Sequence, residues 1–378
     1  MTPVTAPKVS PQQVLAFRTR QHQLGPHRSD GDVALLDYGI QDTGPDGAAW
    51  ALAVRGGEAD PERTALAWTL RAAPHAYRRT DLAAIAVATS PYSEADAAKR
   101  IFDASKPLKA AGIPVLDALK EVATDLRELA AKPIVKGDAS GALNRRLGEP
   151  FLRHCKPCNA VHIYEMPFRL AALQAGLELE AGTSPPVLRR VPKLRPANFA
   201  HSGDEAAPRF DVIRNHLRFF GPASMKDVAG YVDMPLAQVK AHWPADAVEV
   251  EVAGASDMAR FVLDEHLEDL RAKAPAKTHE VTLLGPFDPY LQLRGRDTLV
   301  DDEARRKELW PVLGRPGAMV VDGEVVAAWR PKTAGSKLTL RLQPWTKLTA
   351  AVRSSIEAQA QALAEFRGVR LTGVVDEG

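Results

Sequence analysis

The segment Phe210–Gly254, "FDVIRNHLRFFGPASMKDVAGYVDMPLAQVKAHWPADAVEVEVAG", constrains the fold of this chain more than any other stretch. Its first apolar residues recur at helical spacing, and Gly221-Pro222 predicts the end of that helix. Ser224, with Asp227 three residues later, is the capping-box signature of a second helix. Two prolines bracket a short third helix, and the alternating "AVEVEV" after it predicts a strand. Three short helices followed by a β-ribbon are typical of a winged helix.

The N-terminal region repeats this order of elements. Ser10-Pro11 predicts the start of a helix that runs to about His22. The second and third helices are expected at Asp30–Gly39 and Pro45–Arg55, and Ala65–Arg79 can supply the ribbon.

A fainter copy of the same order follows. A long amphipathic helix is expected over Val115–Ala131, short helices in "ASGALNRRL" and "EPFLRHC", and a strand in "NAVHIYE". No fixed period relates the three copies, so the repetition is one of architecture rather than of sequence.

From about Lys277 the pattern changes to β. "HEVTLLGPFDPYLQLR" holds a strand, and "SKLTLRLQPW" holds another. Between them, "GAMVVDGEVVAAWRP" predicts two strands about an Asp322-Gly323 turn, the dipeptide that most strongly favours a hairpin. An amphipathic helix is expected at Leu348–Phe366.

Composition narrows the class of protein. With 45% apolar and 25% charged residues, the sequence is that of an ordinary globular protein. Its apolar runs fall short of the roughly 20 residues of a membrane helix, and "MTPVTAPKVSPQQ" lacks the pattern of a signal peptide. We therefore expect no membrane partner and a cytoplasmic location. A net charge of +2 neither requires nor excludes nucleic acid.

Several motifs, taken together and in order, resemble the AlkZ/YcaQ family of DNA glycosylases. They are "GIQDTGPDGAAWALAVR", "TLRAAPHAYRRTDL", "GEPFLRHCKPCNAVHIYEMPFR", "LLGPFDPYLQLRGRD" and "VVDGEVVAAWR". The resemblance implies an α+β fold of three tandem winged-helix domains, followed by a β-barrel-like domain with a terminal helix. We expect these domains at 1–95, 96–200, 201–275 and 276–378.

The resemblance also implies an activity. Members of the family bind DNA in a cleft and hydrolyse the N-glycosidic bond of bulky alkylated purines, and some unhook interstrand crosslinks. We expect double-stranded DNA as the partner, a monomeric protein, and no cofactor.

The family's catalytic element is a Gln-x-Gln or Gln-x-Asp triplet, which falls on Gln41-Asp42-Thr43. Gln41 matches, and an amide can orient a water molecule by accepting a hydrogen bond from it. Thr43 departs from both forms of the triplet, and its hydroxyl is a shorter, weaker acceptor. Asp42 can supply charge, although the middle residue of such a triplet usually points away.

The same residues have a purely structural interpretation. Thr43 followed by Asp46, with Pro45 in the first turn, is a helix-start signature. On that interpretation Thr43 and Asp46 cap the third helix and carry no chemistry.

Three groups of polar side chains are candidates for DNA contact, with a solvated charged surface as the alternative for each. The first lies on the N-terminal ribbon, where a histidine matches one of the family; the second lies in the Pro-rich linker "PPVLRRVPKLRP"; the third lies on the third helix of Phe210–Gly254. The residues are His75, Arg71, Arg78 and Arg79; Arg189, Arg190, Lys193 and Arg195; and Gln238 and Lys240.

Cys155 and Cys158, with His154 and His162 nearby, are residues of the types that bind zinc, and the Cys-x-x-Cys spacing is typical of a zinc site. No second Cys-x-x-Cys or His pair stands at a suitable distance, so we favour a pair of thiols and expect no metal. Two cysteines do not make a disulfide framework, which fits a reducing compartment.

Two functions follow in order of preference. The first is a monofunctional glycosylase in which Gln41 positions water. The second is a non-catalytic winged-helix DNA-binding protein, either a transcriptional regulator or a binder of damaged DNA, and Thr43 is the residue that supports it.

Overall fold

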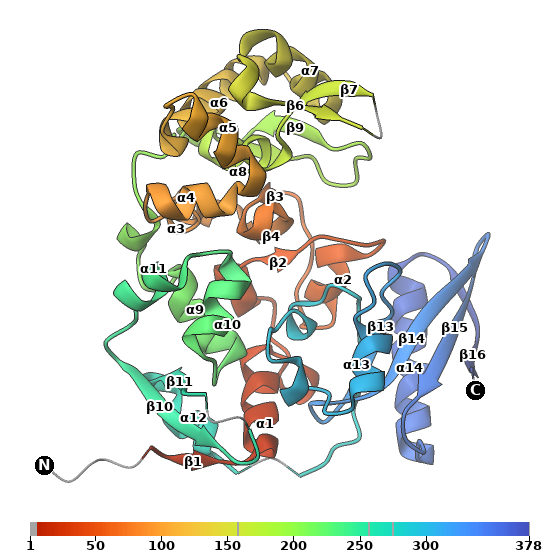
Figure 1. Ribbon diagram of the computed structural model, residues 1–378. Helices are drawn as coiled ribbons and strands as arrows, with labels where there is room; N and C mark the ends of the chain where they lie inside the picture. The colour runs from red at the N-terminus through yellow and green to blue at the C-terminus, as the bar shows by residue number, and fades with distance from the viewer. Residues whose placement is uncertain (1–5, 157–158, 256–257, 274–275, 378) are drawn as a thin grey trace, which may run out of the picture.

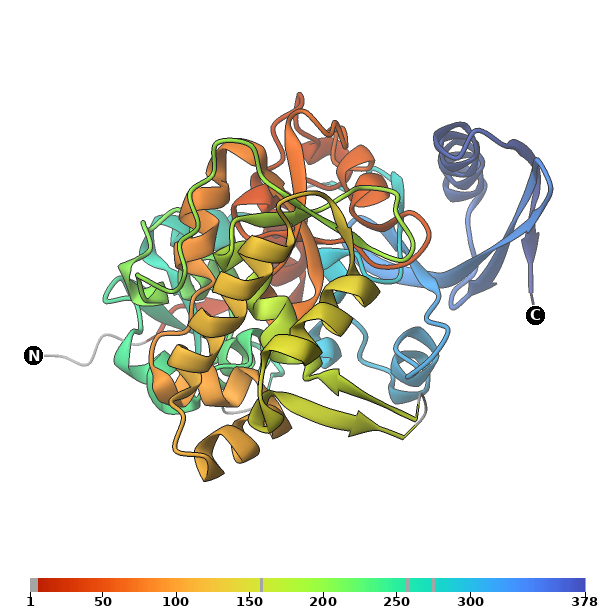
Figure 2. The ribbon, with the colours of Figure 1, turned by 90° about the horizontal axis from the view of Figure 1, so that it is seen from above.

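The computed structural model describes residues 6–156, 159–255, 258–273 and 276–377. Two lobes are stacked along the left of Figure 1, and the C-terminal residues form a third body at the lower right. Seen from above, this third body projects to one side of the other two (Figure 2). The mixed α+β class predicted from the sequence is confirmed.

The segment Phe210–Gly254 folds in the predicted order. Its helices are α9 (Val212–Phe220), α10 (Met225–Val232) and α11 (Leu236–Ala241), followed by the antiparallel pair β10 (Ala247–Val252) and β11 (Arg260–Leu263). Ser224 and Asp227 form the predicted capping box. The N-terminal strand β1 (Lys8–Val9) pairs in parallel with β10.

The N-terminal helices are shorter than the sequence predicts. Helix α1 (Pro11–Gln21) begins after its predicted cap Ser10. The helix expected at Asp30–Gly39 is wrong, since only the 3-10 turn η2 (Ala34–Asp37) forms there. Arg78 explains this, because its guanidinium binds the Asp32 carboxylate and the Val33 carbonyl and so holds the preceding segment in an extended path. The third helix, α2, covers only Gly47–Ala53.

One six-stranded sheet connects the N-terminal region to the upper lobe. Its order is β2-β4-β3-β8-β9-β5. The strands are β2 (Ile40–Gln41), β3 (Thr64–Trp68), β4 (Pro74–Arg78), β5 (Ile134–Val135), β8 (Leu177–Leu179) and β9 (Val187–Arg190). The sheet crosses the expected boundary at residue 95.

The upper lobe is mostly helical (Figure 1). Its helices are α3 (Leu82–Ala88), α4 (Glu94–Arg100), α5 (Ser105–Ala110), α6 (Val115–Leu129), α7 (Lys136–Arg146) and α8 (Glu165–Gln174). The helix expected in "EPFLRHC" is a single 3-10 turn that continues into β6 (Leu152–Cys155), which pairs with β7 (Ala160–Ile163). Proline at the start of this segment and the pairing with β7 favour the strand.

The C-terminal body is a sheet with order β12-β13-β14-β15-β16. Its strands are β12 (Val281–Leu284), β13 (Gly317–Val321), β14 (Glu324–Ala334), β15 (Lys337–Pro344) and β16 (Arg370–Asp376). The predicted turn joins β13 to β14, with positive φ at both Asp322 and Gly323. In the described part of the chain the sheet stays open and does not close into the barrel-like domain that we expected.

The terminal helix α14 (Ala350–Phe366) covers this sheet and also joins it to the N-terminal region. Trp50 of α2 packs against Phe366, with ring centroids 5.2 Å apart, and its indole N–H donates to the Leu283 carbonyl at 2.7 Å. The two regions therefore share one core. No helix in the described ranges is both long and apolar enough to span a bilayer.

Candidate active site

The amide of Gln41 is fixed by hydrogen bonds at both of its ends. Its Nε2 donates to Thr43 Oγ1 at 3.0 Å, and its Oε1 accepts from Arg71 Nη2 at 3.0 Å. Both triplet side chains are half-buried. A carbonyl oxygen has two lone pairs, so Oε1 keeps one for a further donor. The arrangement can hold a water molecule in a defined orientation.

The other residues of this turn have structural contacts. Asp42 turns away, and its Oδ1 accepts from the backbone N–H of Ala48 at 2.9 Å. Asp46 precedes α2 but pairs with Arg367, and its side chain makes no capping hydrogen bond. The capping interpretation is therefore wrong for Thr43 and Asp46, because Asp42 takes that role and leaves the Thr43 hydroxyl to Gln41.

His75 lies directly opposite Gln41 in the pairing of β2 with β4, so both side chains project from the same face of the sheet. Its ring is only 1% exposed. Burial, helped by the charge of Arg71, lowers the pKa of His75 to about 3, so the ring is neutral at physiological pH. Nδ1 lies 2.9 Å from the Ala73 carbonyl. A buried, neutral ring does not favour the predicted contact with phosphate, and His75 instead packs beside Gln41 on the same face of the sheet.

Arg71 connects the triplet to the lower lobe. Its guanidinium lies 4.2 Å above the ring of Tyr231, and Nη1 donates to the Tyr231 carbonyl at 3.2 Å. The backbone of Arg71 has a φ of 56°, which aims the side chain back across the hairpin. The structure thus brings Gln41, Thr43, Arg71 and His75 together.

Arg71 is the first of five arginines that we call the arginine arc. None of the five forms an ion pair within the described ranges. The arc comprises Arg71, Arg294, Arg296, Arg315 and Arg330.

The arc is continuous. Arg294 donates to the carbonyl of Gly230, the neighbour of the Tyr231 carbonyl that Arg71 uses. Burial lowers the pKa of Arg296, and the positive charges of Arg315 and Arg294 lower it further because these two arginines lie nearby. Arg330 donates to the Gly314 carbonyl at 2.6 Å, next to Arg315. Neighbouring cations without carboxylate partners are a surface that favours phosphate.

Other predicted cations are neutralised within the fold. Arg78 pairs with Asp37 at 2.6 Å, and both Arg79 and Arg189 pair with the buried Glu178 at 2.9 and 3.0 Å. An arginine that neutralises a buried carboxylate is not free to contact phosphate without exposing that charge.

The remaining linker cations are exposed. Arg190 donates to the Arg127 carbonyl at 2.6 Å, and Lys193 and Arg195 lie on the surface. Gln238 and Lys240 lie on α11, half-buried and exposed respectively. In Figure 1, α11 is on the left edge of the molecule, on the opposite side from the C-terminal sheet.

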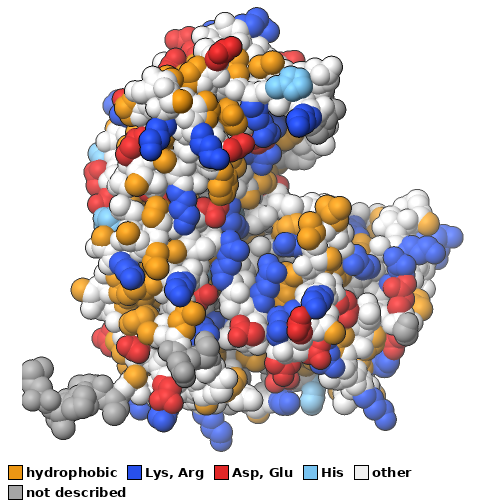
Figure 3. Space-filling model, in the orientation of Figure 1, with side chains coloured by type: hydrophobic (Ala, Val, Ile, Leu, Met, Phe, Trp, Pro, Cys, Tyr) orange, Lys and Arg blue, Asp and Glu red, His pale blue; other side chains and the backbone are white. Residues whose placement is uncertain are grey.

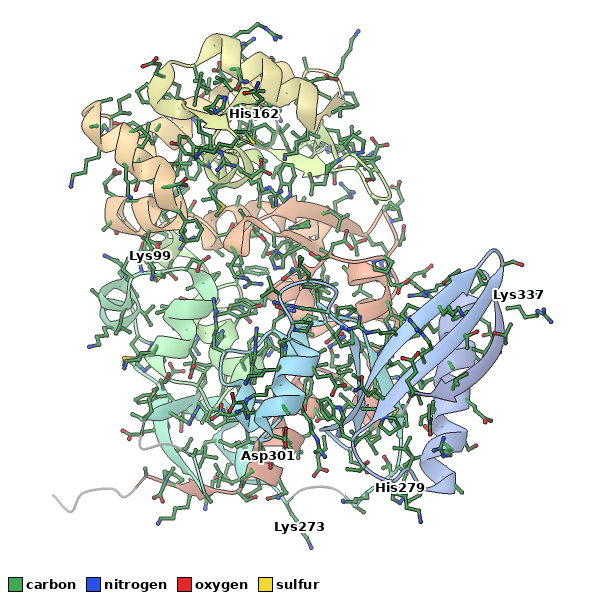
Figure 4. All side chains as sticks on the ribbon, turned by 45° about the vertical axis from the view of Figure 1, so that its right-hand side comes forward. Lys99, His162, Lys273, His279, Asp301 and Lys337 are labelled. Carbon is green, nitrogen blue, oxygen red and sulfur yellow. The ribbon has the colours of Figure 1, made fainter. Side chains whose placement is uncertain are left out.

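Figure 3 shows a deep hollow on the right, between the upper lobe and the C-terminal body, with Lys and Arg side chains along its inner wall. In the same orientation, β2, β4 and α2 lie at its foot (Figure 1). Lys337, at the tip of the β14–β15 hairpin, points outward (Figure 4). The hollow is therefore the candidate nucleic-acid interface, with the triplet at its base.

The possible zinc site is only partly described, since Cys158 lies outside the described residues. Within those residues, no three side chains of His, Cys, Asp or Glu are grouped so that they could hold a metal.

Sequence reasoning missed two features of this region. Asp288 accepts a hydrogen bond from the backbone N–H of Tyr290 at 2.9 Å and also pairs with Arg55 at 2.7 Å, and both side chains are almost fully buried. Arg294 and Arg296 stand in "LRGRD", at the end of one of the quoted motifs, where two closely spaced arginines were the available signal.

Comparisons with known proteins agree on one family. The family described as DNA glycosylase AlkZ-like matches residues 38–366. Among solved structures, the fold is similar to that of the Streptomyces sahachiroi DNA glycosylase AlkZ, with a TM-score of 0.70, 22% sequence identity, and coverage of 98% of this chain and 100% of that one. Among curated proteins, no sequence shows significant similarity to the chain.

Proposed function

The chain belongs to the AlkZ-like DNA glycosylase family, and on that premise we propose that it hydrolyses the N-glycosidic bond of bulky alkylated purines in double-stranded DNA. The fixed amide of Gln41, held by Arg71 and Thr43 beside a surface of unpaired arginines, is the observation that carries the proposal.

Hydrolysis of such a nucleotide requires the protein mainly to position a water molecule and to provide a suitable electrostatic environment. A purine alkylated at N3 or N7 is cationic and leaves as a neutral base with the electron pair of the C1′–N bond. Water adds to C1′, and its proton is lost to solvent. Gln41 orients that water through the free lone pair of Oε1, and Thr43 offers a second acceptor. Arg71 keeps the amide from rotating.

The arginine arc supplies affinity. Its cations contact the phosphates on both sides of the damaged nucleotide, so binding is largely independent of sequence and falls steeply as salt rises. Among the DNA contacts first predicted, six remain proposed: Arg71, Arg190, Lys193, Arg195, Gln238 and Lys240. Arg78, Arg79 and Arg189 are proposed to serve the fold.

The proposal is tested with duplex DNA that carries N7-alkylguanine, followed by mild alkali, which cleaves at abasic sites. Wild-type protein is expected to produce strand breaks at the adduct and Gln41→Ala to produce far fewer. Equal cleavage by both proteins would remove Gln41 from the mechanism. A duplex with one guanine–guanine interstrand crosslink tests crosslink unhooking by the same site.

The second candidate is a DNA-binding protein without catalysis, and Thr43 favours it because its side chain is shorter than that of either family residue. The variant Thr43→Gln separates the two. A gain in excision by this variant identifies an enzyme limited by its second acceptor, whereas binding without excision in both proteins identifies a binder.

The wider organisation is also part of the proposal. Winged-helix units at 1–95, 96–200 and 201–275 precede a β unit at 276–378, and the six-stranded sheet acts as a rigid connection between the first two. The protein is proposed to act as a monomer in the cytoplasm.

A further inference from the structure

Two apolar side chains between α13 (Glu303–Leu309) and β13 are almost fully exposed. Val312 is 93% exposed and Leu313 is 86% exposed, whereas other large hydrophobic side chains on the surface, such as Phe102 at 52% and Val375 at 49%, are about half covered. Because apolar side chains are stabilised by removal from water, an adjacent pair left almost fully exposed is unusual without a partner.

The loop that carries these residues is held in place from both sides. Arg315 Nε donates to the Pro311 carbonyl at 3.3 Å, which closes the loop on itself. Arg330 Nη1 donates to the Gly314 carbonyl at 2.6 Å. Trp310 anchors the start of the loop, because its indole N–H donates to the Leu291 carbonyl at 3.0 Å. The apolar pair is therefore presented on a preorganised support.

The loop also lies beside the triplet. The Arg315 guanidinium sits 5.1 Å above the ring of Phe287. Phe287 in turn lies against Gly44, the residue after Thr43, since a Cβ added to Gly44 would be 4.0 Å from the ring. Phe287 and Thr43 also line the same small pocket. Hydrophobic side chains gather on the rim of the hollow that the C-terminal body provides (Figure 3). The loop that carries the apolar pair thus lies close to the candidate catalytic residues.

We propose that Val312 and Leu313 form an apolar wedge that enters the base stack next to the damaged nucleotide. Two arginines of the arc, Arg315 and Arg330, fix the loop and stand beside the tip, where they can hold the phosphates that flank an opened step. Opening the step exposes C1′ to the water held by Gln41. This inference rests on the proposed glycosylase function, and in it Val312 and Leu313 are positioning residues for that same site.

The test uses duplex DNA with 2-aminopurine beside a tetrahydrofuran abasic analogue, because 2-aminopurine fluoresces more strongly when it is unstacked. Three full-length proteins are compared: wild type, the double variant Val312→Ser/Leu313→Ser, and the control Val375→Ser on the far strand of the C-terminal sheet. Each is measured for duplex affinity, for the fluorescence change at saturation, and for single-turnover excision of N7-alkylguanine.

Wild type and the control are expected to raise the fluorescence several-fold on binding. The double variant is expected to bind within about threefold of wild type, because the arginine arc is intact. It is expected to raise no fluorescence and to excise at least about tenfold more slowly, because nothing then holds the base step open. An undiminished fluorescence rise with the double variant would overturn the wedge.

The outcomes separate this inference from the proposed function. Excision by wild type without any fluorescence rise overturns the wedge and leaves the glycosylase proposal standing. A fluorescence rise that depends on Val312 and Leu313, without excision of any adduct, supports the wedge in a protein that binds damage but does not cleave it.

Discussion

Two sets of arginines in this molecule look alike in the sequence and differ completely in the fold. Arg55, Arg78, Arg79 and Arg189 each neutralise a carboxylate that is largely or fully buried. The arginine arc has no such partners in the described part of the chain and borders the Gln41 amide. The comparison teaches that the partner of a cation, rather than its presence in a basic stretch, decides between a structural role and a role in binding DNA.

The largest expected effect on stability is at the arginines that pair with buried carboxylates. Arg55→Met leaves Asp288 charged, buried and unpaired, which is expected to lower the free energy of unfolding by about 3–5 kcal/mol. Arg353→Met, which removes an exposed pair with Asp376, is the control and is expected to change the free energy of unfolding little. Urea denaturation measures both. Similar losses for the two variants would break the distinction.

A pH titration sharpens the comparison, because a buried histidine that has no carboxylate partner is expected to stay neutral in the folded protein. Burial lowers the pKa of His75 and of His216 to about 3, from 6.5 in an unfolded chain. Their contribution to stability is therefore complete above about pH 6.5 and is lost as the pH falls from there toward 3. At pH 5 each ring is expected to cost about 2 kcal/mol.

Urea unfolding at pH 7 and pH 5 tests this expectation, with the variant His216→Phe as a check. The variant is expected to lose less stability than wild type between the two pH values. Equal losses would mean that His216 already titrates normally in the folded protein.

A smaller effect is expected at the arc itself. Arg294 is exposed, and its guanidinium donates to the Gly230 carbonyl, so Arg294→Met is expected to change stability little. It should lower the slope of log affinity against log salt by about one, the loss of one phosphate contact. Arg353→Met, again the paired control, should leave the slope unchanged. Fluorescence anisotropy with duplex DNA over a range of salt concentrations measures both slopes.

The sequence predicts what is local. The Ser10 cap, the capping box of Ser224 and Asp227, and the Asp322-Gly323 turn all form as predicted, because each depends on residues within three or four positions of one another. The same holds for most helices and strands.

What the sequence does not predict depends on contacts between distant residues. Arg79 meets Glu178, and Arg55 meets Asp288, across the fold, so neither pairing leaves a local pattern. His75 looks like a surface charge beside three arginines, yet tertiary packing buries it. The Gln41 triplet was predicted from resemblance alone, and only the structure reveals Arg71 as the residue that fixes its amide.

The central claim is that Arg71 acts through Gln41, and a double-mutant cycle tests it most directly. Single-turnover excision of N7-alkylguanine at saturating protein is measured for wild type, Gln41→Ala, Arg71→Met and the double variant. Each single variant is expected to lose about tenfold or more, and the double variant to lose little beyond the worse single one, because both changes remove the same held water. Losses that multiply in the double variant, or a Gln41→Ala protein that excises at the wild-type rate, would contradict the account.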